Sequence, residues 1–171
     1  MKTFQQMQNS PKNNLPEYII VHHSAARADQ TFKSIQDYHV SLGWENFGYH
    51  WCITKDGTLI SGRPEHYYGS HCKEESMNTK SVGVLVVGDF DNNLPTKEQE
   101  TTLKTLLKDI QVRYNIPKEK IVPHRHFLGN PPYKTCYGKL LSDTWAKDLI
   151  SKPIVNKEDI KKQIISLLNQ F

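Results

Sequence analysis

The chain has 171 residues, of which 37% are hydrophobic and 23% are charged, and its formal net charge is +4. This length suits one domain with a substantial core. The composition excludes a disordered or collagen-like chain. No apolar run approaches the ~20 residues that a membrane-spanning helix needs. The basic residues are spread along the chain without a nucleic-acid-binding motif, so we expect neither a membrane nor a nucleic-acid partner.

The segment at residues 1–16 is polar and lacks the apolar middle of a secretory signal peptide. We therefore expect a mobile leader on a protein that is made in the cytoplasm. The chain also has three cysteines, an odd and sparse set that predicts free thiols or a metal ligand instead of a disulfide framework. They are Cys52, Cys72 and Cys136.

The first predicted strand covers residues 18–23, YIIVHH, because aromatic and β-branched side chains suit a pleated surface. Successive side chains of a strand point to opposite faces. His22 and His23 therefore cannot easily converge on one point, and at most one of them is expected to belong to a given site.

The elements that follow alternate between helix and strand. Residues 31–42 have apolar side chains at helical spacing, and Gly43 ends that helix. Residues 48–60 predict a β-hairpin, since two β-rich runs flank an Asp-Gly turn dipeptide. The polar and aromatic stretch 62–80 has no periodicity and predicts a long loop, which in compact domains is often functional.

The second half of the chain continues this alternation. Residues 81–88 form an apolar run that predicts a strand buried on both faces. Thr96 is expected to cap a helix that continues to Tyr114, and residues 121–138 begin as a strand and become a loop. Residues 156–171 predict a final amphipathic helix. The fold class is therefore α/β, a single domain with a central mixed sheet flanked by helices.

The residues that could carry chemistry include imidazoles and a thiol near strand ends. Zinc favours imidazole nitrogen and thiolate sulfur, and a catalytic zinc ion usually has three protein ligands and a water. From spacing alone, satisfied or surface histidines and a buried thiol remain the alternative, because eight histidines offer many triples. The candidates are His22 or His23, His124 or His126, and Cys136.

Several motifs occur in one order and together strengthen this interpretation. VHHSAA is followed by a helix carrying YH, then by GWENFGYH, KDGTLISGRPEHYYGSH, NTKSVGVLVVGDF and PHRH…KTC. This combination resembles the type 2 N-acetylmuramoyl-L-alanine amidase family, which includes small bacteriophage lysozyme-amidases and is related to peptidoglycan recognition proteins. The likeness covers residues 17–145. It implies a zinc amidase domain at 17–150, and the amphipathic pattern at 156–171 predicts a helical extension at 151–171.

The resemblance also implies a set of metal ligands. In the family, the histidine after the strand valine, the histidine of the H-R motif and the cysteine of K-x-C bind Zn²⁺. These positions are His22, His124 and Cys136, so His23 is expected to point away, while His126 remains an alternative to His124. The loop between the second and third ligands carries an apparent GNPP insertion. Loops tolerate insertions at small cost, so we expect Cys136 to reach the metal.

Other family positions are implied to act on the substrate. Tyr49 of GYH and Lys134 of K-x-C correspond to the catalytic residues. Zinc lowers the pKa of a bound water toward ~7 and polarises a carbonyl, and either of these two side chains could stabilise the oxyanion that follows. The positions implied to bind substrate are His71, Asn78, His50 and Arg63, although His50 may equally be a packed histidine.

The implied activity is hydrolysis of the amide between N-acetylmuramic acid and L-alanine in peptidoglycan, by a monomeric phage-type endolysin. Such an enzyme would need a separate release route from the cytoplasm to the cell wall. The alternative is a non-catalytic peptidoglycan-binding recognition module. Family members of that kind typically lose the ligand cysteine, whereas Cys136 is present here.

Overall fold

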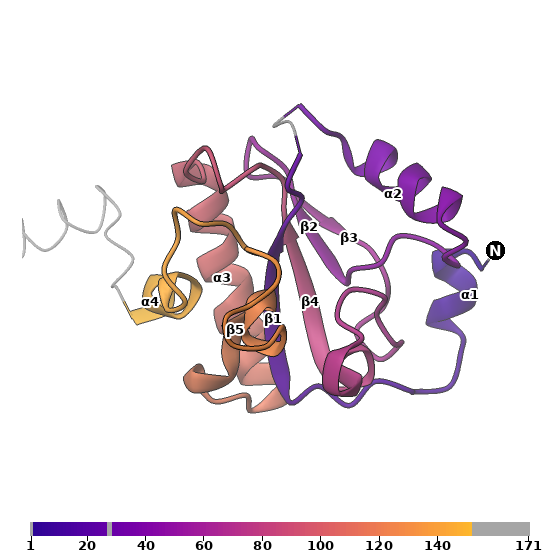
Figure 1. Cartoon of the computed structure of the whole chain (residues 1–171). Coiled ribbons are helices and arrows are strands. Elements are labelled where there is room, and N and C mark those ends of the chain that lie inside the picture. The colour runs from indigo at the N-terminus through magenta and orange to yellow at the C-terminus, as the bar shows by residue number, and fades with distance from the viewer. Residues whose placement is uncertain (1, 27–28, 152–171) are drawn as a thin grey trace, which may run out of the picture.

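The computed structural model describes residues 2–26 and 29–151 (Figure 1). Its centre is a five-stranded sheet with the order β3-β2-β4-β1-β5. β4 runs parallel to β1 and β2, β5 runs parallel to β1, and β3 is antiparallel to β2. The predicted mixed sheet is therefore confirmed. The strands are β1 (Tyr18–His23), β2 (Trp51–Ile53), β3 (Leu59–Ser61), β4 (Ser81–Val86) and β5 (Ile121–Pro123).

Helices cover both faces of this sheet (Figure 1). On one side lie α3 (Lys97–Tyr114) and α4 (Trp145–Ser151), and on the other lie α1 (Phe4–Gln8) and α2 (Phe32–Ser41). Three short 3₁₀ segments complete the described structure, namely η1 (Glu74–Thr79), η2 (Lys118–Lys120) and η3 (His124–Phe127). In the described ranges no helix is long and apolar enough to cross a membrane.

Alternation along β1 divides its side chains between the two faces. Ile19 and Val21 join an apolar cluster with buried side chains of α3, including Leu103 and Leu107. Ile20 belongs to a separate cluster on the opposite face. Burial of such side chains stabilises the fold by roughly 1.5–3 kcal/mol each, so strand and helix are held together mainly at their shared apolar face.

The predicted N-cap of α3 is confirmed in the structure. The Thr96 hydroxyl accepts the Gln99 backbone N–H at 3.1 Å, and the Gln99 side chain accepts the Thr96 N–H at 3.1 Å. This reciprocal pair satisfies two backbone donors that a helix start would otherwise leave open. The predicted hairpin is also confirmed, with Gly57 at a φ of +83° in its turn.

The N-terminal segment differs from the predicted polar leader. Residues 4–8 form α1, begun by a capping box between Thr3 and Gln6, and Met7 is fully buried. Further along, the buried Asn14 amide donates to the Ser81 carbonyl at 2.9 Å. The N-terminal segment is polar in composition, yet it contributes one buried apolar side chain, that of Met7, and one buried amide, that of Asn14. At the other end, the predicted helix 156–171 lies outside the described residues.

Candidate metal centre

The C-terminal end of β1 carries the first candidate ligand. His22 is paired in register with Leu85 of β4, and its side chain is 1% exposed. It lies on the face of the sheet opposite to His23, whose Nδ1 accepts the Phe90 backbone N–H at 3.1 Å. The structure thus separates the two histidines by strand alternation and packs His23 against the α3 side of the molecule.

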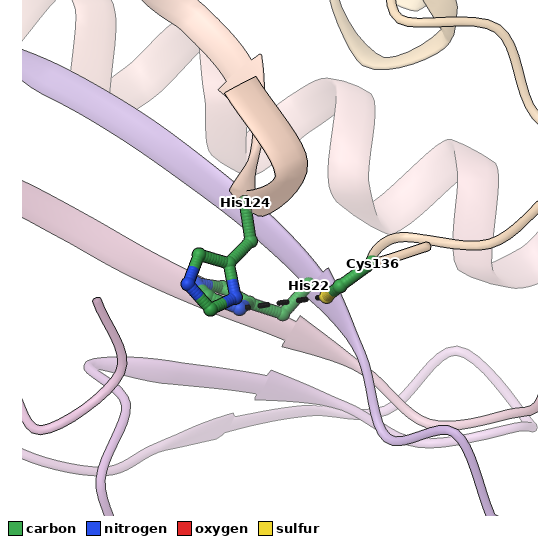
Figure 2. Close-up of side chains that lie close together, drawn as sticks. All are labelled: His22, His124 and Cys136. Atoms are coloured by element: carbon green, nitrogen blue, oxygen red, sulfur yellow. Dashed lines mark hydrogen bonds between the residues drawn. The ribbon is translucent and has the colours of Figure 1, made fainter. Parts of the chain in front are cut away.

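Three side chains from distant parts of the chain meet beside β1 (Figure 2). His124 begins η3 directly after β5, and Cys136 returns on the following loop. One ligand atom from each of His22, His124 and Cys136 lies within 4.8 Å of the others. The Cys136 Sγ is 3.6 Å from His22 Nδ1, and the rings of His22 and His124 are 4.6 Å apart. His126 is exposed and belongs to neither candidate metal group of the described residues.

The donor set and its spacing fit zinc. Zinc–nitrogen bonds of about 2.0 Å and a zinc–sulfur bond of about 2.3 Å at tetrahedral angles separate the two donors by roughly 3.5 Å. The observed distance between the Cys136 sulfur and the His22 nitrogen is 3.6 Å. Two imidazoles and one thiolate also leave a fourth position for water or substrate, as in catalytic zinc sites.

The electrostatic environment keeps these ligands neutral when no metal is bound. Burial, reinforced by the nearby His124, His71 and His23, lowers the pKa of His22 well below its usual value. Burial raises the pKa of the Cys136 thiol to about 12. A neutral imidazole can bind a metal ion without losing a proton. The thiol must instead release its proton to the solvent when a metal binds.

His71 lies directly behind His22 and fixes its orientation. The His22 Nε2 is 3.1 Å from His71 Nδ1, so an Nε2–H donated to His71 leaves the His22 Nδ1 lone pair toward Cys136. Two glycines make room for the His71 ring. A Cβ atom at Gly69 would lie 2.3 Å from its Cδ2, and one at Gly83 would lie 2.5 Å from it. The ring is 7% exposed.

Arg125 closes the loop that brings Cys136 back to the site. Its backbone N–H donates to the Cys136 carbonyl at 2.8 Å. Its guanidinium donates to the carbonyls of Thr135 at 2.9 Å, Gly138 at 2.6 Å and Leu141 at 2.6 Å. The expectation that an insertion does not prevent the loop from returning agrees with this arrangement, since the closing contacts lie outside the inserted residues.

The two predicted catalytic side chains lie beside the ligands. The Tyr49 ring centroid is 5.0 Å from that of His22, and burial raises the pKa of the Tyr49 hydroxyl, so it stays protonated. Lys134 is exposed on the Cys136 loop. Its positive charge adds to the burial that lowers the pKa of His124, against the opposing effect of Glu74.

The remaining predicted substrate ligands are engaged inside the protein. His50 is 1% exposed, accepts the Gly83 N–H at 2.8 Å and lies 2.9 Å from the Tyr67 carbonyl. The guanidinium of Arg63, 2% exposed, donates to the Phe47 carbonyl at 2.7 Å. Both side chains therefore have hydrogen-bond partners inside the protein, and their contact with a substrate stays a prediction.

Asn78 and Glu74 organise the loop beside the site. The Asn78 side-chain oxygen accepts the backbone N–H groups of His71 at 2.8 Å and Cys72 at 2.9 Å. Burial alone would raise the pKa of Glu74, but hydrogen bonds, first among them that from Tyr133, hold it at about 2. Sequence reasoning missed Glu74, because an aperiodic loop gives no indication of which side chains turn inward. It also missed Arg125, whose position inside the H-R motif was the available signal.

Comparisons with known proteins identify the family of this chain. The N-acetylmuramoyl-L-alanine amidase family matches residues 11–139. The endolysin of Escherichia phage T7 is 38% identical over 138 residues, which cover 76% of this chain and 85% of that protein. Peptidoglycan-recognition protein SC2 of Drosophila simulans is 36% identical over 121 residues, 66% of this chain and 65% of the relative, so this match spans slightly less than two thirds of its length.

Among solved structures, N-acetylmuramoyl-L-alanine amidase LysC from Clostridium intestinale URNW aligns with a TM-score of 0.72 and 29% identity. The alignment covers 83% of this chain and 89% of that one. The two proteins therefore share the fold over most of their length.

Proposed function

This chain belongs to the N-acetylmuramoyl-L-alanine amidase family, and from that premise we propose that it hydrolyses the amide between N-acetylmuramic acid and L-alanine in peptidoglycan with one Zn²⁺ ion. The observation that carries the proposal is the convergence of ligand atoms from His22, His124 and Cys136 within 4.8 Å. The endolysin of phage T7, at 38% identity, supports a lytic role.

Each side chain around this centre has a chemical task in the proposed reaction. Bound zinc would supply a Lewis acid that polarises the scissile carbonyl and activates a water. His71 holds His22 in the orientation that presents Nδ1. The protonated hydroxyl of Tyr49 can donate a hydrogen bond to the developing oxyanion, and the cation of Lys134 adds positive potential at the exposed side.

A pocket next to Tyr49 offers a place for part of the substrate. It has a volume of about 390 Å³ and lies between α2 and the ends of β1 and β4. The side-chain oxygen of Gln30, one of its lining residues, is buried and has no hydrogen-bond partner in the described part of the chain. A polar group of a muropeptide donating to this oxygen would satisfy it, since buried polar atoms are normally paired.

The second candidate function is recognition of peptidoglycan without cleavage, which the similarity to a peptidoglycan-recognition protein favours. Enzyme and recognition module share the fold and differ in turnover. The presence of Cys136 among the converging donors favours the enzyme.

The experiment measures zinc content and muropeptide cleavage on the same preparation after dialysis against zinc-free buffer. The wild type should retain about one zinc ion per chain and release a free L-alanine amino terminus. Cys136→Ala should lose both properties. Cys52→Ala, which changes a buried thiol in a separate cluster, should keep both.

Two other results would contradict the proposal in different ways. Tight muropeptide binding by zinc-loaded wild type without cleavage would identify a recognition module. Retention of zinc and activity in Cys136→Ala would show that this thiol is not a ligand, even if the enzyme class is right.

A further inference from the structure

A second group of metal-binding side chains adjoins the first and shares one histidine with it. Ligand atoms of Cys72, Glu74 and His124 all lie within 4.8 Å of one another. Cys72 and Glu74 come from the loop before β4, and neither has a role in the proposed amide hydrolysis. The cluster combines a thiol, a carboxylate and an imidazole, three of the groups that zinc accepts.

The distances inside this cluster suit ligands of one metal ion, and the distance from Glu74 to His124 is long for a hydrogen bond between charged groups. The Glu74 Oε2 lies 3.5 Å from His124 Nε2 and 3.7 Å from the Cys72 Sγ. A charge-assisted N–H···O bond is normally about 2.7–2.9 Å long. Two donors about 2.0–2.3 Å from a tetrahedral zinc ion are instead about 3.3–3.5 Å apart, which is close to the observed separations.

His124 presents a different ring nitrogen to each group. Its Nε2 faces Glu74, while Figure 2 shows its other nitrogen facing His22 and Cys136. The imidazole therefore stands between two possible metal positions. We propose that Cys72, Glu74 and His124 form a second, weaker site for a soft divalent cation such as Zn²⁺ or Cd²⁺.

The surroundings hold this second site in place. Asn78 fixes the backbone at Cys72 through the hydrogen bond to its N–H at 2.9 Å. The Tyr133 hydroxyl donates to the Glu74 Oε1 at 2.8 Å, which leaves Oε2 available for a cation. Cys72 is buried and Tyr133 is 63% exposed, so the site is open to solvent at its tyrosine side and closed at its thiol.

Binding at this site releases protons in a defined way. The cation takes the Cys72 sulfur as thiolate, and the thiol proton leaves to solvent. When the first site is filled through the other nitrogen of His124, the Nε2 proton must leave as well. This additional deprotonation is why the second site should be weaker than the first.

Occupation should also affect turnover, an expectation that rests on the proposed function. A second cation on the ring of His124 withdraws electron density from a ligand of the first metal. Excess zinc should therefore inhibit muropeptide cleavage in the wild type. Cys72→Ser should remain active at the same excess, because a serine hydroxyl is a poor ligand for a soft ion.

The direct test is a Cd²⁺ titration of the full chain, followed by thiolate-to-metal absorption and equilibrium dialysis. The wild type should bind a first equivalent tightly and a second one more weakly. In Cys72→Ser and Glu74→Gln the second event should be at least about tenfold weaker. Glu75→Gln, a change at the exposed neighbouring carboxylate, should leave both events intact. Cys136→Ala should retain the thiolate-to-metal absorption that comes from Cys72. Circular dichroism should show that each variant is folded.

The proposal is wrong if the wild type saturates at one equivalent, or if Cys72→Ser leaves the second event unchanged. A Glu74→Gln variant that weakens the first binding event and leaves the second unchanged would also contradict it, since Glu74 would then merely orient His124 for the first metal. These readouts do not depend on cleavage. A wild type that binds two metal equivalents but, with zinc in the first site alone, does not cleave muropeptides would contradict the proposed function and not the second site.

Discussion

The two faces of the central sheet bury different chemistry. Toward α3 and α4, β1 and β4 present apolar side chains such as Val21 and Val84, which join one large apolar cluster. Toward α2 and the loop before β4, the molecule buries four imidazoles that have hydrogen-bond partners, namely His22, His39, His50 and His71. The first face is therefore mainly apolar, whereas the second combines smaller apolar clusters with individual polar contacts.

The comparison indicates that one face of the sheet mainly determines stability and the other mainly determines chemistry. Apolar burial is non-directional and scales with area, so many substitutions on that face should reduce stability without moving a ligand. The buried imidazoles are held by individual hydrogen bonds, although His71 Nε2 has no such partner among the described residues. A single substitution on this face should therefore alter the site more than the fold. The predictions below probe this division.

The largest effect on stability is expected at the apolar face. Leu107 of α3 is fully buried, and Leu107→Ala should lower the free energy of unfolding by about 2–5 kcal/mol. Urea denaturation measures this change, and zinc binding by the folded protein should stay the same. Val112→Ala on the same helix, at an 83% exposed position, should change stability by less than about 0.5 kcal/mol. A weaker zinc affinity in folded Leu107→Ala would contradict the inference that the apolar face affects stability and not the metal site.

Among the side chains that do not bind the metal, the largest effect on the cleavage rate is expected at Tyr49. Tyr49→Phe removes the hydroxyl beside His22 and should lower the rate of cleavage by about 10²–10³, with little change in unfolding. Steady-state kinetics at saturating zinc measure it. The matched control is Tyr18→Phe at the other end of β1, which should leave the rate unaltered. An unchanged rate in Tyr49→Phe would mean that its ring acts only in packing.

A smaller effect on the metal is expected from His71. His71→Ala removes the partner of His22 Nε2 and should weaken zinc binding by about 10–100-fold, as loss of an orienting group typically does. Zinc affinity is measured by competition with a chelator, and His66→Ala serves as the control. His71→Asn restores an acceptor and should recover part of the affinity. A raised KM with unchanged zinc affinity would instead assign His71 to the substrate.

The smallest effect is a pH dependence of stability on the α2 side. Burial, together with the charge of Arg63, lowers the pKa of His39 to about 4, so the folded state favours the neutral ring. This contribution is fully present above about pH 6.5 and is lost as the pH falls toward about 4. The loss should be about 1–2 kcal/mol.

Unfolding of His39→Asn across this pH range provides the measurement. An asparagine can accept the Gly48 N–H that His39 Nδ1 accepts at 3.2 Å, yet it does not titrate. The variant should therefore show a flatter stability profile than the wild type or the control His66→Asn. Identical profiles for all three proteins would show that His39 does not contribute.

Local patterns in the sequence predict most of the fold. The hairpin and the N-cap at Thr96 are set by contacts between near neighbours, which periodicity and capping preferences report directly, and β1 is recognised by its aromatic and β-branched composition. The α1 helix was missed because its five residues show little periodicity, and Phe4 contacts Phe32, far along the chain.

Local sequence patterns predict only part of the candidate site. Strand alternation separates His22 from His23 without any structure. The motifs that contain His50 and Arg63 mark both residues as candidates for a site. Their hydrogen bonds inside the protein depend on loop conformation, which the sequence does not reveal. The same limit applies to Glu74, since its approach to His124 joins two loops that share no pattern.

The contacts of Arg125 have a consequence for how the loop can vary. Its backbone N–H and guanidinium bind carbonyl groups on both sides of the Cys136 sulfur. These contacts lie outside the tip at residues 129–132, so they close the loop without using the tip. The tip can lengthen, shorten or acquire new side chains over evolutionary time while the geometry at the sulfur stays constant.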